Sequence, residues 1–132
     1  MLEVQSIHAY YGLAHVIRGV SLVVGRGEAV ALLGRNGAGK TTIVKAIMGL
    51  ITPKEGRVLL EGRDVTGFPP HLIARRGLSL VPSGRGIFPA LTVIEHLRVP
   101  VPISRSARAD LLARCLELFP ELKGRMKQKA CS

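Results

Sequence analysis

Hydrophobic and polar residues alternate at the start of the chain, over residues 2–7, which predicts a strand with one buried and one solvated face. A second apolar segment, residues 20–24, is closed by a glycine-rich turn and predicts a second strand. Residues 10–12 lie between these segments and are predicted as a loop. Residues 29–33 are apolar at every position, which favours a strand buried on both faces of a parallel sheet.

The pattern changes after residue 42, where apolar residues recur at helical spacing. Ile43, Ala46 and Ile47 follow this spacing, and Gly49 is placed to end the helix. Short apolar runs then predict two further strands, over residues 57–60 and 78–81.

Helices are predicted in the second half of the chain from their start and stop residues. A short helix is expected over residues 71–76, after a pair of prolines. Thr92 can cap a second helix that extends to residue 97. Ser104 or Ser106 starts a third helix, which Pro120 ends.

Composition narrows the class of protein. The 132 residues are 47% hydrophobic, which is enough for one folded domain and excludes a disordered chain. With no Trp and 4% aromatic residues, stacking platforms for single-stranded nucleic acid are not expected. No apolar run is long enough to span a membrane, and the first residues predict no signal peptide. The net charge of +10 favours an anionic partner, such as a nucleic acid or a membrane surface.

One segment carries specific chemistry. Residues 34–41 match G-x-x-x-x-G-K-[ST] at every fixed position, between an apolar run and a helical pattern. Glycines let backbone N–H groups turn toward phosphate oxygens, Lys40 supplies a positive charge, and the Thr41 hydroxyl suits Mg²⁺. By contrast, His8, His15 and His71 have no cysteine or carboxylate at ligand spacing, so no metal site is predicted at them.

The loop also carries a family resemblance. Residues 34–42 resemble the Walker A loop of ABC-transporter ATP-binding subunits. Further segments resemble the branched-chain amino-acid importer subfamily; they are residues 8–12, 19–22, 61–67, 69–71, 81–82 and 88–93. The implied fold is the N-terminal portion of an α/β P-loop NTPase, with an antiparallel β-region and the start of a helical subdomain. The resemblance implies one partial domain over residues 1–132, with a β-rich nucleotide-binding core over 1–92 and helical subdomain over 93–132.

The resemblance assigns roles to individual residues. Tyr11 is expected to stack on adenine, with Tyr10 as its competitor. Thr41 is expected to bind Mg²⁺, and Ser83 to reach it through water, at a position where the subfamily usually has Glu. The expected ATP-binding residues are Tyr11, Gly34, Arg35, Asn36, Gly37, Ala38, Gly39, Lys40, Thr41 and Thr42.

The resemblance also implies partners and a location. These are ATP and Mg²⁺ as cofactors, transmembrane permease subunits, a second ATP-binding subunit, and a peripheral place on the cytoplasmic face of the inner membrane. The family's signature, Walker B and switch His segments are not found in these 132 residues, so the chain is expected to be truncated and inactive alone, with no catalytic residue of its own. Glu61 and Glu95 are the carboxylates to test first if it turns over ATP.

Two other functions remain open from the sequence. The chain could be a nucleotide-binding fragment without hydrolysis or a role in transport. It could also be a basic nucleic-acid-binding protein that carries a P-loop, although no helix-turn-helix, zinc-finger or RNP pattern is present.

Overall fold

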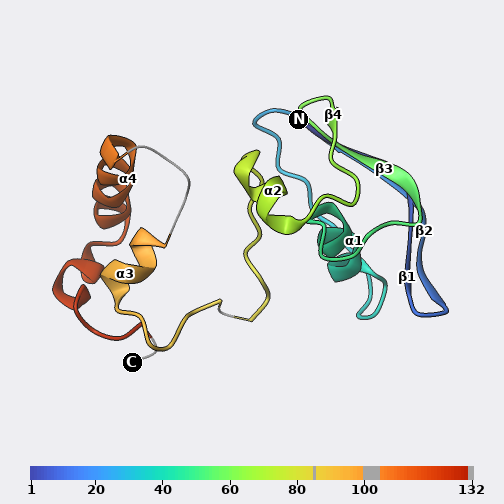
Figure 1. Cartoon of the computed structure of the whole chain (residues 1–132). Helices are drawn as coiled ribbons and strands as arrows, with labels where there is room; N and C mark the ends of the chain where they lie inside the picture. The colour runs from blue at the N-terminus through green and yellow to red at the C-terminus, as the bar shows by residue number, and fades with distance from the viewer. Residues whose placement is uncertain (85, 100–104, 131–132) are drawn as a thin grey trace. The chain divides into compact units, whose positions relative to one another are not determined.

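The computed structural model describes residues 1–84, 86–99 and 105–130 of the chain (Figure 1). The chain divides into two compact units, Met1–Leu80 and Val81–Ser132. The first unit holds the sheet and the phosphate loop, and the second consists of helices. Within the described residues, no helix combines the length and the apolar character needed to cross a membrane.

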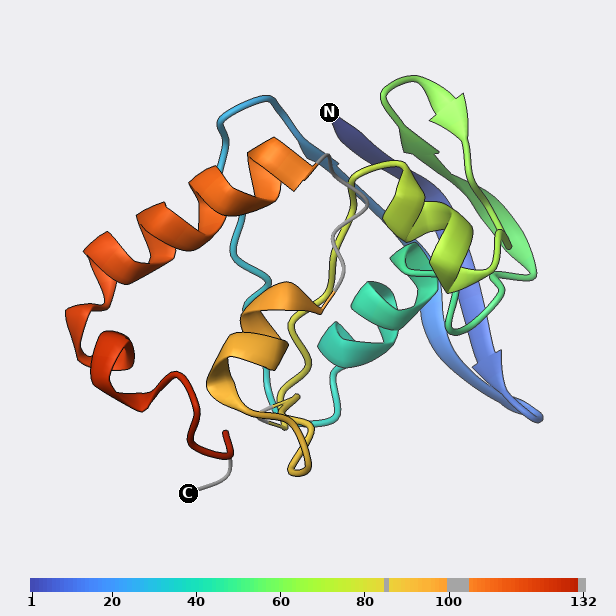
Figure 2. The same ribbon diagram turned by 60° about the vertical axis from the view of Figure 1, so that its left-hand side comes forward.

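An antiparallel sheet in the order β2-β1-β3-β4 is the framework of the first unit. β1 (Leu2–Tyr11) and β2 (Ala14–Val24) form a long hairpin. β3 (Glu55–Leu60) pairs with the other edge of β1 and then with the short β4 (Arg63–Asp64). α1 (Lys40–Ile47) lies along one face of this sheet in both views (Figures 1 and 2).

The hydrophobic core of the first unit lies between the sheet and its helices. α2 (Pro70–Arg75) adds Ile73, which is 1% exposed. Burial of this apolar surface is the main stabilising contribution to the unit. The buried apolar residues are Val4, Ile7, Ala9, Ile17, Ile43, Ala46, Ile47, Met48, Val58, Val65 and Ile73.

The strand predicted over residues 2–7 is confirmed, but its alternation is interrupted by a bulge. The pairing of β1 with β2 shifts register between Val4 and Ile7, and Ser6 between them has φ 44°. The extra residue lets Val4 and Ile7, three positions apart, both face the core. Gly56 of β3 packs against the backbone of Gln5 and Ser6 here, where a side chain would not fit.

Two predicted strands are wrong, and the loop predicted over residues 10–12 is confirmed only at Gly12, which lies in the turn before β2. Residues 29–33 and 78–81 form no strand in the structure. A strand needs a neighbour to receive its hydrogen bonds, and neither segment pairs with another within the described residues. Residues 10 and 11, predicted as part of a loop, are the last residues of β1, because β2 begins at Ala14 and pairs with them.

The predicted helices are confirmed with small shifts in their bounds. Helical spacing after the phosphate loop corresponds to α1, and Gly49 follows it with φ 69°. The helix expected over 71–76 is α2. α3 (Val93–Arg98) begins directly after its predicted cap, Thr92. α4 (Arg105–Leu118) begins near the expected start and ends before Pro120; Ser104 lies outside the described residues.

The second unit closes on itself through backbone hydrogen bonds. A short 3-10 helix, η1 (Pro120–Arg125), follows α4. The segment after it returns to the start of α3, where the N–H groups of Val93 and Ile94 donate to the carbonyls of Gln128 and Met126 at 3.0 Å. These bonds fix the entry into α3 within the unit.

Candidate functional site

The phosphate loop, residues 34–41, enters α1 through an unusual N-terminus. Gly39 is the N-cap residue, with φ 92°, and no side chain caps the helix. The first N–H groups of a helix have no acceptor within the helix, and they lie at the positive end of its dipole. α1 therefore presents uncapped donors at the loop, as an anion-binding site requires.

Gly39 also fixes the loop against the sheet. A Cβ atom at this position would lie 2.6 Å from Cδ1 of Ile17, which is 2% exposed in β2. Gly37 also has a left-handed conformation, with φ 83°, but a Cβ atom there would meet no atom within 4 Å. Gly37 is thus needed for its conformation, and Gly39 for both conformation and space.

The side chain of Lys40 folds back across the loop. Its Nζ donates hydrogen bonds to the carbonyl oxygens of Gly34 at 2.7 Å and Arg35 at 2.8 Å. An ammonium group has three donors, so these bonds hold the cation in the loop and leave one donor for an anion. The loop is further closed by the N–H of Ala38, which donates to the carbonyl of Arg35 at 3.2 Å.

A pocket of about 240 Å³ lies at the junction of the loop and α1. Its donors are backbone N–H groups, an ammonium and hydroxyls, with no carboxylate among the lining residues. This set fits a polyphosphate, and the exposed Thr41 offers the hard oxygen ligand that Mg²⁺ prefers. The lining residues are Asn36, Gly37, Gly39, Lys40, Thr41 and Thr42, all within the predicted ATP-binding segment.

Tyr11 and Tyr10 differ in availability. Tyr11 ends β1 and is 48% exposed, and no ring or polar contact holds its side chain among the described residues. Tyr10 is already stacked on His15, with ring centroids 4.2 Å apart, and the Nζ of Lys54 lies 4.9 Å from its centroid. The free ring is therefore Tyr11. The sequence did not anticipate this difference, because it depends on the start of β2.

Ser83 lies in the second unit, in an exposed bend. Its predicted water-mediated contact with Mg²⁺ stays a prediction, and so does the whole assignment of ATP-binding residues.

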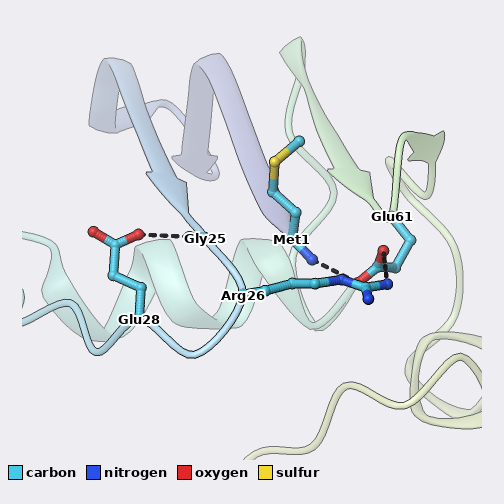
Figure 3. A network of polar contacts seen from close by, with 5 residues as sticks. All are labelled: Met1, Gly25, Arg26, Glu28 and Glu61. Carbon is cyan, nitrogen blue, oxygen red and sulfur yellow. Dashed lines mark hydrogen bonds and ion pairs between the residues drawn. The ribbon is translucent and has the colours of Figure 1, made fainter.

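Glu61 and Glu95, the two carboxylates singled out from the sequence, both hold local structure. Figure 3 shows Glu61 between the N-terminal ammonium of Met1, at 2.6 Å, and Arg26, at 3.2 Å. Hydrogen bonds from that ammonium and then from Arg26 lower the pKa of Glu61. In the same network Glu28 accepts a hydrogen bond from the N–H of Gly25. Glu95 belongs to the capping box of α3. Neither Glu61 nor Glu95 lines the phosphate-loop pocket.

Residues 17–131 match the protein-family model described as "ABC transporter". The probable branched-chain amino acid transport ATP-binding protein LivF of Archaeoglobus fulgidus is 34% identical over 131 residues. The high-affinity branched-chain amino acid transport ATP-binding protein BraG of Pseudomonas aeruginosa is 36% identical over 131 residues. Each match covers 98% of this chain and 56% of the relative, so the chain spans about half the length of these relatives.

Other transport systems match as well, among them ATP-binding proteins for lipopolysaccharide export and for molybdate or tungstate import. A solved structure described as the ATP-binding subunit of an ABC transporter has a TM-score of 0.86 and 32% identity. That match covers 98% of this chain and 54% of the solved one. The fold is therefore that of the N-terminal portion of an ABC ATPase.

Proposed function

The chain belongs to the ABC transporter ATP-binding family, and on this premise we propose that it binds Mg-ATP as part of the ATP-binding subunit of a branched-chain amino-acid importer. The observation that carries the proposal is the uncapped start of α1 beside the Lys40 ammonium. This arrangement supplies fixed donors and a positive charge at one point, which is the chemistry of a phosphate site.

Each part of the nucleotide has a proposed partner in the first unit. Backbone N–H groups at the start of α1 hold the phosphate oxygens, and Lys40 neutralises their charge. The Thr41 hydroxyl is the proposed ligand of Mg²⁺, which spreads the charge of the outer phosphates when it is bound. Tyr11 stacks on adenine, and Thr42 lies on the α-phosphate side.

Titration of Mg-ATP against the chain by calorimetry tests the proposal. Lys40→Ala should weaken binding about 10- to 150-fold, because a hydrogen bond to a charged group is worth about 1.5–3 kcal/mol. Lys45→Ala is the matched control, since it removes the same side chain five residues further along α1 and outside the pocket. Equal affinities of the parent and Lys40→Ala would contradict the proposal.

The transport role rests on the names of the relatives. We propose that the protein works with transmembrane permease subunits and a second ATP-binding subunit, at the cytoplasmic face of the inner membrane. Inactivating the gene should reduce uptake of labelled leucine, isoleucine and valine and leave methionine uptake unchanged. If only the uptake of another solute were lost, the proposed substrate class would be wrong, while the proposed binding of ATP would stand.

A further inference from the structure

Four side chains form a connected group on the face of the hairpin that points away from α1. We call His8, Tyr10, His15 and Lys54 the hairpin ladder. Tyr10 and His15 are stacked with their planes 12° apart, and Nδ1 of His8 lies 3.0 Å from Nε2 of His15. The ammonium of Lys54 lies over the ring of Tyr10. His8, Tyr10 and His15 are all half-buried, although they lie on the outer face of the sheet.

The strand register places this ladder directly behind Tyr11. Tyr10 pairs with His15, and Tyr11 pairs with Ala14 as the last pair before the turn at Gly12 and Leu13. Successive residues of a strand face opposite sides, so Tyr10 lies on the face of the ladder while Tyr11 lies on the same face as Ala9. Ala9 is buried on the α1 side and pairs with Ile17, the residue against which Gly39 packs.

Tyr11 therefore lies on the same face of the sheet as Ala9, two residues further along β1. Ala9 in turn pairs with Ile17, which is the neighbour of Gly39 in the phosphate loop. Two residues along a strand span about 7 Å, which separates Tyr11 from Ala9. Its own neighbours hold it weakly, because Ala14 offers only a methyl group and Leu13 is fully exposed. The only ring stack of the hairpin tip, among the described residues, is the one that Tyr10 makes with His15.

We propose that the hairpin ladder positions Tyr11 for the base of the nucleotide, with His15 as the principal positioning residue. This inference rests on the proposed function. The ladder holds the last two residue pairs of the hairpin in one conformation before ATP binds. Without it, the tip must be ordered at the time of binding, and that loss of freedom lowers the affinity for the base but not for the phosphates.

The test compares ATP with tripolyphosphate, which has the phosphates but no base. His15→Ala should raise the Kd of Mg-ATP about three- to tenfold, the range expected when an aromatic pair is lost. The Kd of tripolyphosphate should not change. His15→Phe keeps a ring for Tyr10 and should restore most of the ATP affinity. His71→Ala is the matched control, because His71 lies on α2 and outside the ladder.

A double-mutant cycle separates positioning from general stability. In a Tyr11→Ala background, His15→Ala should cause no further loss of ATP affinity, because the ladder acts through Tyr11. Equal weakening of ATP and tripolyphosphate, unchanged ATP affinity, or an undiminished effect in the Tyr11→Ala background would each overturn the inference. A parent chain that binds neither compound would instead overturn the proposed function, and the inference with it.

Discussion

Gly39 and Gly37 have similar backbone conformations and different surroundings, so they separate two costs of a side chain in the phosphate loop. Gly37→Ala should cost about 1–2 kcal/mol of stability from its left-handed φ alone. Gly39→Ala should cost more, because its Cβ would also press on the buried methyl of Ile17. Thermal unfolding and ATP titration of both variants check this expectation. Equal costs would mean that the contact with β2 is easily relieved.

The two tyrosines can be told apart by fluorescence, because the chain has two Tyr and no Trp. Tyr10→Phe keeps the stack on His15 and leaves Tyr11 as the only strong emitter. ATP should then change the tyrosine emission, and tripolyphosphate should not. Tyr11→Ala should weaken the binding of ATP by about 1–3 kcal/mol, the range for loss of base–aromatic stacking, and Tyr10→Ala should weaken this binding less. The reverse order would assign the adenine contact to Tyr10.

At the residue scale, sequence is most informative where the chemistry is local. The phosphate-loop motif places Gly39, Lys40 and Thr41 side by side in the sequence, and in the structure they line one pocket; their binding of ATP stays a prediction. The partner of Tyr10 could not be predicted in the same way. His15 is set opposite Tyr10 by the register of β1 and β2, which shifts between the pair Ala9 and Ile17 and the pair Tyr10 and His15.

At the scale of elements, helices were predictable and several strand details were not. A helix makes its hydrogen bonds within itself, so start and stop residues such as Thr92 and Gly49 define it from nearby sequence. A strand is completed by a neighbour. Residues 29–33 have the apolar composition of a buried strand, yet no described segment pairs with them, and Leu33 is 91% exposed.

The capping box of α3 gives a prediction at this scale. Thr92 Oγ1 donates to the Glu95 carboxylate at 2.7 Å, and the Thr92 N–H donates to the same oxygen at 2.8 Å. Thr92→Ala should destabilise α3 by about 0.5–2 kcal/mol at neutral pH, the usual cost of losing a cap. Amide hydrogen exchange in α3 measures this.

The same cap should depend on pH with a definite sign. The hydrogen bond from the Thr92 side chain, followed by that from its backbone, lowers the pKa of Glu95. A carboxylate whose pKa falls on folding stabilises the folded state above its unfolded pKa, and this contribution is lost as the pH falls through the folded pKa. The cost of Thr92→Ala should therefore shrink in acid, below the ordinary range of glutamate. In a Glu95→Gln background, which has no charge to lose, the cost of Thr92→Ala should not vary with pH.

At the scale of the whole molecule, the excess of 19 basic over 9 acidic residues leaves the choice of anion open. The phosphate-loop pocket favours a polyphosphate as the anion, because it combines Lys40 with the N-terminus of α1 and has no carboxylate in its lining. The fold itself was predictable from the loop and its flanking segments. The division after Leu80 depends on packing between distant residues, whereas the boundary after residue 92, which the resemblance implies, stays a prediction.

Nucleotide binding and hydrolysis should separate in these 132 residues. Phosphoryl transfer needs an oriented water and stabilised charge in addition to a phosphate grip. No carboxylate lines the phosphate-loop pocket, and Glu61 and Glu95 hold local structure within the described part of the chain. Losing one preorganised group from an active site costs about 10²–10³ in rate. We therefore expect the chain alone to bind Mg-ATP and to release phosphate no faster than buffer.

A phosphate-release assay at saturating Mg-ATP checks this prediction. Turnover that requires Mg²⁺ and disappears in Lys40→Ala would contradict it, because that activity would have to come from the phosphate loop. Glu61→Gln and Glu95→Gln would then identify the carboxylate. Each oxygen of Glu61 accepts one hydrogen bond, from Met1 and from Arg26, and these contacts hold the side chain in its present position. Glu95 is held by the N–H and the hydroxyl of Thr92, both on one of its oxygens. A catalytic role that breaks these contacts would show as lost protection of the same segment in hydrogen exchange.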